Sequence, residues 1–273
     1  MTAECVPEER SEEPAPALDR MANVRDVGGL TVEDGGAIRQ GVLYRSDQPL
    51  PGDQVPDLDP WPPAAIVDLR SPHELRAPHP LAGVTSTIVS VAVMDEAEPA
   101  RIGIGPSQPD IARRHGRLYT RILERSGRDF ETIAATVAEA SGPTLVHCAA
   151  GKDRTGVTIA VLLSAVGVLP REIVADYQVT AANAPALFER LIIAEPEARR
   201  RQRRERLLAM HGVLAMTPRE AIEGVISELT GHQNGAGGWL VGNGLSLAQL
   251  ELLRDRLVDP DGGTDRQPRP RTP

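Results

Sequence analysis

The chain has 273 residues, of which 41% are hydrophobic and 25% are charged, and its formal net charge at pH 7 is −8. These values are typical of a soluble globular protein with one domain and extensions, and they exclude wholesale disorder. Two Phe, two Trp and three Tyr residues offer few rings for base stacking, so composition and charge together argue against nucleic-acid binding.

The two ends of the chain differ in composition from its middle. Residues 1–20 are rich in Glu, Pro and Ala, and residues 259–273 are rich in Pro, Gly, Arg and Asp, so neither segment can build a core. We predict a disordered tail at each end of a domain that spans residues 21–258.

Between these tails, short β-branched segments alternate with longer segments of helical periodicity. The predicted strands are Val42–Tyr44, Ala65–Leu69, Ser86–Val93 and Thr144–His147. The predicted helices are Ile111–Glu124, Phe130–Ala140, Arg154–Val168, Arg171–Thr180, Ala186–Ile193, Glu197–Met210, Pro218–Thr230 and Ser246–Leu257, the last two opened by capping boxes at Thr217–Glu220 and Ser246–Gln249. This alternation predicts an α/β fold, with a mostly parallel central sheet of about four strands flanked by helices and a helical C-terminal third.

No membrane span or secretion signal is predicted. The longest nearly apolar run, Val157–Leu169, is too short to cross a bilayer, and the acidic N-terminus lacks the apolar centre of a signal peptide. Two cysteines, Cys5 and Cys148, do not make a disulfide framework. We therefore expect a cytoplasmic, reducing location.

The segment after the last predicted strand has the most specific chemistry. Cys148 and Arg154 are separated by five residues, C-x5-R, between a strand and a helix that begins near Arg154. Such a loop turns successive backbone N–H groups toward one point at the helix N-terminus, where the helix dipole also favours an anion. The residues expected to bind phosphate in this way are Ala149, Ala150, Gly151 and Lys152. The segment therefore predicts a phosphate site beside a cysteine thiolate.

Each neighbouring side chain has an expected role in that chemistry. Cys148 is the expected nucleophile, and Arg154 can hold two phosphoryl oxygens with its planar fork. Thr155 is expected to donate its hydroxyl to the sulfur, and His147 to hold the loop through backbone hydrogen bonds. Lys152, the single lysine of the chain, is expected to contact substrate charge. Together these groups predict attack of sulfur on phosphorus, followed by attack of water on the thiophosphate.

Two other interpretations of this segment were weighed. A buried structural cysteine is common, but it is not typically followed by Gly, Lys, Asp, Arg, Thr and Gly. A nucleotide-binding P-loop would need glycine at position 146 and Ser or Thr at position 153, where this chain has Val146 and Asp153. The P-loop interpretation is therefore excluded.

The segment His147–Gly156 resembles the signature loop of cysteine-dependent protein tyrosine phosphatases, and more closely that of the bacterial branch typified by mycobacterial protein tyrosine phosphatase B. Other stretches that agree with this branch in order are Asn23–Gly29, Leu43–Ser46, Val67–Ser71, Ile173–Tyr177 and Gly238–Leu257. The resemblance covers about residues 20 to 258. It implies hydrolysis of phosphotyrosine, and often of phosphoserine, phosphothreonine or phosphoinositides, without a metal or another cofactor.

The group that protonates the leaving oxygen has two candidates. Asp153 lies in the loop itself, and Asp95 follows the strand after which related phosphatases carry a mobile acid loop. We favour Asp153 slightly, although it could instead brace the loop through Arg25 or Arg45. Trp61-Pro62-Pro63 resembles the Trp-Pro-Asp loop of eukaryotic relatives only superficially, because it lacks the acid.

Four further residues are expected to support the site rather than to react. Asp68 and Arg70 end a strand near the expected ligand crevice, and Arg25 and Asp26 are expected mainly to fix N-terminal turns. The six histidines show no spacing typical of metal ligands, so no metal site is predicted.

The helices within residues 183–212 are expected to form a lid, as the resemblance implies. Their apolar residues expected to cover the pocket are Leu187, Leu191, Ile192, Leu207 and Leu208. The second helix also carries a basic block: Arg199, Arg200, Arg201, Arg203, Arg204 and Arg206. A solvated helix face is the simpler interpretation of this block, and weak contact with a membrane surface or acidic substrates is the alternative.

The sequence thus predicts a phosphatase acting on phosphotyrosine-type monoesters of proteins, with phosphoinositides as further candidate substrates. The rival hypotheses are a phosphate-binding pseudophosphatase and a redox-sensing thiol protein. Intact Cys148 and Arg154 argue against the pseudophosphatase.

Overall fold

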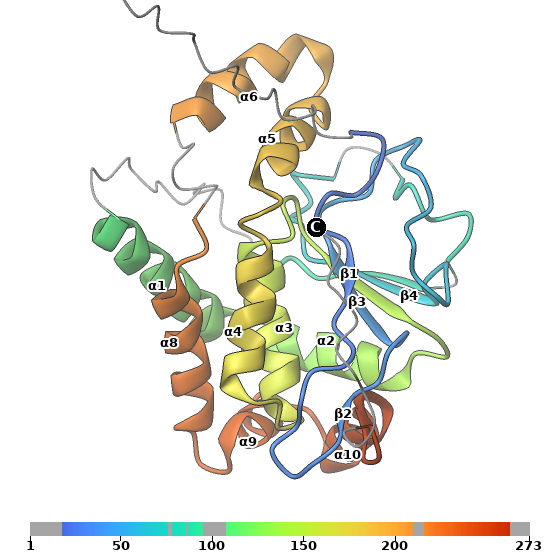
Figure 1. The fold of residues 1–273 in the computed structure, drawn as a ribbon, viewed down its shortest axis with the longest axis vertical. Coiled ribbons are helices and arrows are strands. Elements are labelled where there is room, and N and C mark those ends of the chain that lie inside the picture. The colour runs from blue at the N-terminus through green and yellow to red at the C-terminus, as the bar shows by residue number, and fades with distance from the viewer. Residues whose placement is uncertain (1–17, 76–77, 86, 95–107, 210–215, 263–273) are drawn as a thin grey trace, which may run out of the picture.

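The computed structural model describes residues 18–75, 78–85, 87–94, 108–209 and 216–262. Its main sheet has five strands in the order β1-β3-β6-β4-β5 (Figure 1). These strands are β1 (Arg25–Asp26), β3 (Leu43–Ser46), β4 (Ala65–Asp68), β5 (Thr87–Ser90) and β6 (Thr144–His147). Strands β3, β6, β4 and β5 are parallel to one another, and β1 is antiparallel to β3. The predicted α/β class with a mostly parallel sheet is therefore confirmed.

The helices follow the predicted order. They are α1 (Gln108–Arg125), α2 (Gly127–Glu139), α3 (Asp153–Ala165), α4 (Pro170–Val179), α5 (Ala184–Ile193), α6 (Glu197–Ala209), α8 (Arg219–Thr230), α9 (Gly235–Gly242) and α10 (Leu247–Leu257). Within the described residues, no helix is long and apolar enough to cross a membrane.

The two faces of the sheet are covered differently. Side chains such as Val67 and Val146 point to the face that packs on α2 and α3, within the main hydrophobic core. Ile66 and Leu145 point to the other face, where Leu58, Trp61 and Leu81 from connecting segments cover them. Cys148 directly follows the carboxyl end of β6, the edge of the sheet at which α/β proteins typically bind ligands.

Four elements differ from the predictions. Strand β1 was not predicted, because two residues give no periodic signal. The short β2 (Ala37–Ile38) pairs with β7 (Val258–Asp259), so the predicted domain boundary at residue 258 falls inside a strand. Helix α9 was also missed, because Gly-rich segments have low helix propensity.

The two capping boxes had opposite outcomes. Ser246 caps α10, with Gln249 closing the box as predicted. The box predicted at Thr217 is wrong, because α8 begins at Arg219 after Pro218 and has no side-chain cap.

Helices α5 and α6 lie at the top of Figure 1, at the opposite end of the molecule from α9 and α10. The carboxyl ends of β3 and β6 lie near these helices, because Arg190 of α5 donates to Asp47 after β3 and the apolar residues of α5 and α6 pack on Ala149 and Ala150 after β6. This end therefore holds the loop that the sequence singled out.

Candidate active site

The loop that begins at Cys148 connects β6 to α3 in a tight, buried turn. The Cys148 side chain is only 3% exposed. Gly151 has φ +65°, and a Cβ there would lie 2.3 Å from the carbonyl oxygen of Ser46. Glycine is thus required at position 151 for two reasons, the positive φ and the close approach of β3. The next residues begin α3, with the Gly156 N–H donating to the Lys152 carbonyl at 2.7 Å.

A buried ionic network holds this loop from behind. The Gly151 carbonyl accepts hydrogen bonds from Asn23 Nδ2 at 3.0 Å and from Arg45 Nη2 at 2.8 Å. Arg45 also pairs with Asp176 on α4, and Arg25 Nε donates to the same carboxylate at 2.8 Å. Burial alone would raise the pKa of Asp176, but Arg45 and Arg25 outweigh it and lower the pKa. Arg25 and Arg45 therefore pair with Asp176, and not with Asp153 as the alternative interpretation of that acid suggested.

Arg154 is held by an acid that the sequence analysis did not single out. Its Nη1 and Nη2 donate to Glu74 Oε2 and Oε1 at 2.5 and 2.8 Å, and Nη1 also donates to the Leu69 carbonyl at 3.2 Å. Burial alone would raise the pKa of Glu74, but its bonds with Arg154 lower it, so Glu74 stays ionised. The guanidinium is consequently fixed in one orientation beside the loop.

Asp153 joins a second polar cluster on the helical side of the loop. Tyr119 from α1 donates to Asp153 Oδ1 at 2.7 Å, and the Tyr119 and Tyr177 hydroxyls are 2.7 Å apart. Burial would raise the pKa of Asp153, but the charges of Lys152 and His115 with the Tyr119 bond outweigh it and lower the pKa. The free protein therefore holds Asp153 as a carboxylate.

Lys152 belongs to the same cluster and is 1% exposed. Its Nζ donates to the Met216 carbonyl at 3.1 Å and lies 3.3 Å from His115 Nε2 and 3.8 Å from Asp153 Oδ1. Burial lowers the pKa of Lys152. The ammonium is thus directed at α1 and the segment before α8, rather than standing free for substrate charge.

His147 and Thr155 flank the loop. His147 Nδ1 lies 3.2 Å from the Cys148 carbonyl, in agreement with its expected role of holding the loop. Burial lowers the pKa of His147 to about 4. The Thr155 hydroxyl is buried without a hydrogen-bond partner among the described residues, so the expected bond to Cys148 is not formed in this structure.

The other supporting residues lie where a structural role predicts. Asp26 accepts hydrogen bonds from the Gly28 and Gly41 N–H groups at 2.8 and 2.7 Å and so fixes two turns. Asp68 and Arg70 form a two-point ion pair at the end of β4. Arg70 Nη1 also donates to Gln48 at 2.7 Å, which links β4 to the segment after β3.

The second candidate acid, Asp95, lies outside the described residues.

In the predicted lid, apolar residues of α5 and α6 form a cluster against Ala149 and Ala150 of the loop. The cluster consists of Phe188, Leu191, Ile192 and Leu207. Of the other predicted lid residues, Leu187 is buried and Leu208 is 56% exposed. The two helices therefore reach the loop that begins at Cys148.

In the basic block of α6, Arg199, Arg200, Arg201, Arg204 and Arg206 are exposed. Arg204 pairs with Glu189 at 2.7 Å, and Arg201 lies 3.5 Å from Glu205. These arginines therefore lie on a mostly solvated helix face, the simpler of the two interpretations.

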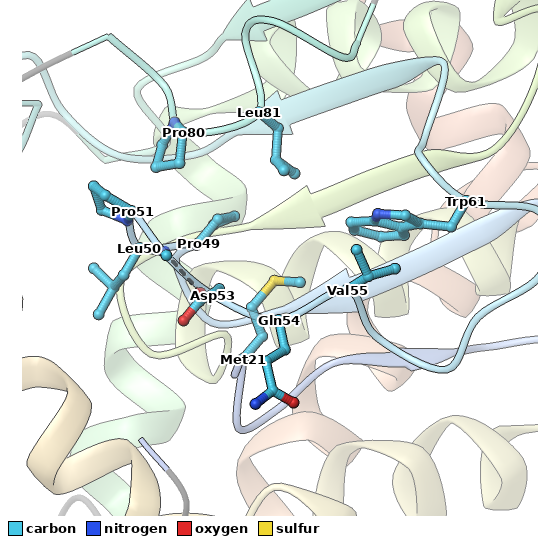
Figure 2. A pocket seen from close by; sticks show the side chains of 11 residues that line it. Met21, Pro49, Leu50, Pro51, Asp53, Gln54, Val55, Trp61, Pro80 and Leu81 are labelled. Atoms are coloured by element: carbon cyan, nitrogen blue, oxygen red, sulfur yellow. Dashed lines mark hydrogen bonds between the residues drawn. The ribbon is translucent and has the colours of Figure 1, made fainter. Parts of the chain in front are cut away.

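Figure 2 shows a pocket of about 310 Å³ on the loop-covered side of the sheet. Its walls are largely apolar and are lined by Met21, Pro49, Leu50, Pro51, Gly52, Asp53, Gln54, Val55, Trp61, Pro80 and Leu81. The adjoining Gln48 N–H donates to the Ala149 carbonyl at 3.2 Å, so the segment that forms one wall also contacts the loop that begins at Cys148. Trp61 stacks near Tyr44 and carries no acid into the site, as expected.

Glu74, Asp176, Tyr119 and His115 were missed from the sequence. For Glu74 a local signal existed, because Ser71 and Glu74 have the Ser-x-x-Glu spacing of a reciprocal cap. The Ser71 N–H donates to Glu74 Oε2 at 2.9 Å in the structure. For Asp176 a signal also existed, because it lies in Ile173–Tyr177, one of the stretches that resemble the phosphatase branch. Tyr119 and His115 lie on α1, and only the fold brings them to the loop.

A cysteine at the end of a buried strand, with a fixed arginine six residues on at the start of a helix, is the arrangement typical of cysteine-dependent phosphatase-like proteins. Residues 16–259 match the family model of the tyrosine phosphatase family. The chain therefore belongs to the tyrosine phosphatase family.

Three relatives share parts of the sequence. A protein of Cupriavidus necator, described as an inferred tyrosine-protein phosphatase, is 34% identical over 176 residues, which cover 59% of this chain and 61% of that protein. A tyrosine-protein phosphatase of Nostoc commune is 39% identical over 67 residues, or 24% of this chain and 23% of that protein. The triple specificity protein phosphatase PtpB of Mycobacterium tuberculosis is 46% identical over 56 residues, or 20% of each chain. The chain thus spans less than two thirds of the length of each relative.

Proposed function

We propose that this protein is a cysteine-dependent phosphatase that hydrolyses phosphotyrosine-type monoesters. The observation that carries this proposal is the junction of β6, loop and α3, where Cys148 and Arg154 flank a turn whose Gly151 carbonyl accepts hydrogen bonds from Asn23 and from Arg45 of β3. Membership of the tyrosine phosphatase family supports it.

The hydrogen bonds of Arg154 leave a suitable edge for phosphate. Glu74 and Leu69 take both Nη1 protons and one Nη2 proton among the described residues. The Nε–H and the second Nη2–H remain, and in a planar guanidinium these two lie parallel along one edge. That edge can bind two phosphoryl oxygens while Glu74 holds the opposite side.

The reaction then proceeds in two displacements. The Cys148 thiolate forms the S–P bond as the P–O bond to the substrate breaks, and the leaving oxygen takes a proton from Asp153. Water next attacks phosphorus, the S–P bond breaks, and the water proton passes to the Asp153 carboxylate. A bound phosphate dianion places negative charge near Asp153, which raises its pKa from the lowered value of the free protein and so favours the protonated form.

We propose that substrates include phosphoserine, phosphothreonine or phosphoinositides as well as phosphotyrosine. Support comes from the name of the Mycobacterium tuberculosis relative, which describes three specificities, although the likeness covers only 56 residues. Assays of phosphopeptides beside phosphoinositides would measure this breadth of substrate specificity.

Helices α5 and α6 act in this proposal as a lid, because their apolar cluster lies on Ala149 and Ala150.

Hydrolysis of a chromogenic aryl phosphate tests the proposal directly. We expect turnover at mildly acidic pH that vanadate blocks and that Cys148→Ser abolishes. A wild-type protein that binds phosphate analogues without turnover would instead be a phosphate-binding pseudophosphatase. Reversible oxidation of Cys148 without turnover would indicate a redox-sensing thiol protein.

A further inference from the structure

Three potential metal ligands meet behind the phosphate-binding loop. Asp68 ends β4, His147 ends the neighbouring β6, and His79 comes from the segment after β4. The Nε2 atoms of His79 and His147 are 3.0 Å apart, and His147 Nε2 is 3.8 Å from Asp68 Oδ2. One ligand atom from each residue lies within 4.8 Å of the others. Asp68 and His147 are buried, whereas His79 is half-buried and gives access from solvent.

The surroundings fix two of these side chains for ligation. His147 Nδ1 faces the Cys148 carbonyl at 3.2 Å, so it carries the proton and leaves the lone pair of Nε2 directed at His79. A metal-bound histidine typically donates its other ring N–H to a carbonyl in this way. Asp68 is oriented by the Nε and Nη2 groups of Arg70, at 2.9 and 2.7 Å.

We propose that Asp68, His79 and His147 form a binding site for Zn²⁺, and that the bound ion inhibits the enzyme. Two imidazoles and a carboxylate, with a fourth position open to water, are a common zinc ligand set. Two nitrogens on one tetrahedral zinc ion, at bonds of about 2.0 Å, are about 3.3 Å apart. The observed 3.0 Å between the two Nε2 atoms therefore needs only a small opening. Inhibition rests on the phosphatase activity proposed above, whereas binding does not.

Zinc binding requires a proton to move between the two ring nitrogens of His79, and this cost makes the binding of zinc reversible. The Leu81 N–H points at His79 Nδ1 at 3.2 Å, so the proton of the neutral His79 ring sits on Nε2 and bridges to His147. Zinc needs the lone pair of that Nε2, so the proton moves through solvent to Nδ1. The Leu81 bond is lost in exchange for a metal bond. Arg70 keeps its contacts with Asp68, and its positive charge further weakens the affinity of the site for Zn²⁺.

Inhibition follows from the position of His147. The ion would draw the two rings into tetrahedral geometry, and His147 is joined directly to Cys148 and bonded to its carbonyl. Pre-organised reacting groups tolerate little displacement, so even a small movement of His147 that is passed on to Cys148 lowers the rate. We therefore expect zinc to lower turnover without touching the sulfur.

Binding is best measured in the full chain with Cys148→Ser, which removes direct capture of zinc by the thiolate. Titration with Zn²⁺ by calorimetry, and with Co²⁺ by its visible absorption, should show one ion per chain. His79→Gln should weaken binding at least tenfold, since its amide can still donate to His147 but is a poor ligand. His73→Ala, an exposed histidine in the same segment, should bind like the parent. Equal binding by His79→Gln, or no binding by the parent, would overturn the site.

Inhibition is measured in the chain with Cys148 intact, each variant relative to its own rate in EDTA. Wild type and His73→Ala should lose aryl phosphatase activity with added Zn²⁺ and regain it with EDTA, while His79→Gln needs at least tenfold more zinc. Equal sensitivity of His79→Gln would place the inhibitory zinc elsewhere and refute this part of the proposal. A wild type without turnover in EDTA would refute the proposed function, yet the calorimetry would still decide the metal site.

Discussion

Glu74 and Arg154 form a two-point ion pair, with Nη1–Oε2 and Nη2–Oε1 distances of 2.5 and 2.8 Å, although eighty residues separate them in the chain. The pair aligns the guanidinium so that its remaining edge can face a phosphate. Glu74 therefore acts on the reaction through Arg154 rather than by touching substrate.

Glu74→Gln should lower kcat/KM for an aryl phosphate by about 10- to 100-fold, because hydrogen bonds to charged groups are worth about 1.5–3 kcal/mol. The weaker alignment should also raise the inhibition constant of vanadate. Glu223→Gln is a matched control, since it breaks an exposed pair with Arg219. Equal kinetics for the two variants would show that Glu74 does not position Arg154.

Asp153→Asn should remove the decline in kcat with rising pH that deprotonation of a general acid causes. The neighbours of Asp153 lower its pKa in the free protein and bound phosphate raises it, so the wild-type decline in kcat should begin at higher pH than the decline in kcat/KM, which reports the free protein. The loss of rate should be large, about 100- to 10,000-fold, for an alkyl phosphate, and smaller for a nitrophenyl ester that leaves without a proton. A decline that persists in Asp153→Asn and disappears in Asp95→Asn would assign the acid to Asp95.

Asp176→Asn should destabilise the fold by about 3–5 kcal/mol, the usual cost of leaving buried charges uncompensated. It would strand Arg45 and Arg25, whose side chains are 1% and 16% exposed. Chemical denaturation measures this loss. Asp34→Asn is the control, since its pair with Arg254 is exposed and should be worth about 0–1 kcal/mol.

The same carboxylate gives a pH dependence with a definite sign. Because the pKa of Asp176 is lowered in the folded state, its stabilisation is present above its unfolded pKa of about 3.9 and is lost as the pH falls through the folded value. Wild type should therefore lose stability below about pH 4. The Asp176→Asn protein should lose less over the same range.

Leu207→Ala should expose Cys148 to reagents, because Leu207 belongs to the cluster that packs on Ala149 and Ala150. We expect faster alkylation of Cys148 by iodoacetamide, followed by mass spectrometry of its peptide so that Cys5 is counted separately. Leu208→Ala changes the adjacent, 56% exposed leucine and should leave the rate unaltered. Identical rates in both variants would remove the lid from the proposal.

Sequence reasoning placed the secondary structure around Cys148 correctly, because that structure is local. Cys148, Gly151 and Arg154 lie in one short strand–loop–helix segment, and the strand Thr144–His147 was predicted with its observed bounds. It could not predict pairs made by the fold, such as Glu74 with Arg154 or His79 with His147, because no periodicity connects them. Helix α9 shows the same limit, since Trp239 packs on Phe130 with ring centroids 5.6 Å apart and tertiary packing overrides its glycines.

Lys152 is the residue for which the structure most changes the expectation. The sequence suggested that a compact ammonium is needed beside the phosphate, whereas its Nζ lies 3.1 Å from the Met216 carbonyl and 3.3 Å from His115 Nε2. A planar guanidinium is larger and needs more partners, and overpacking a buried site costs about 1–3 kcal/mol. Lys152→Arg should therefore lower the melting temperature as well as kcat/KM.

Lys152→Met separates charge from shape, because it keeps an unbranched side chain that is only one atom shorter and removes the ammonium. Asp153 would lose its strongest favourable charge, so its pKa should rise and the decline of kcat should move to higher pH. Both variants need a melting curve and a pH–rate profile. A Lys152→Arg protein that melts like wild type but binds substrate poorly would instead support direct contact between Lys152 and the substrate.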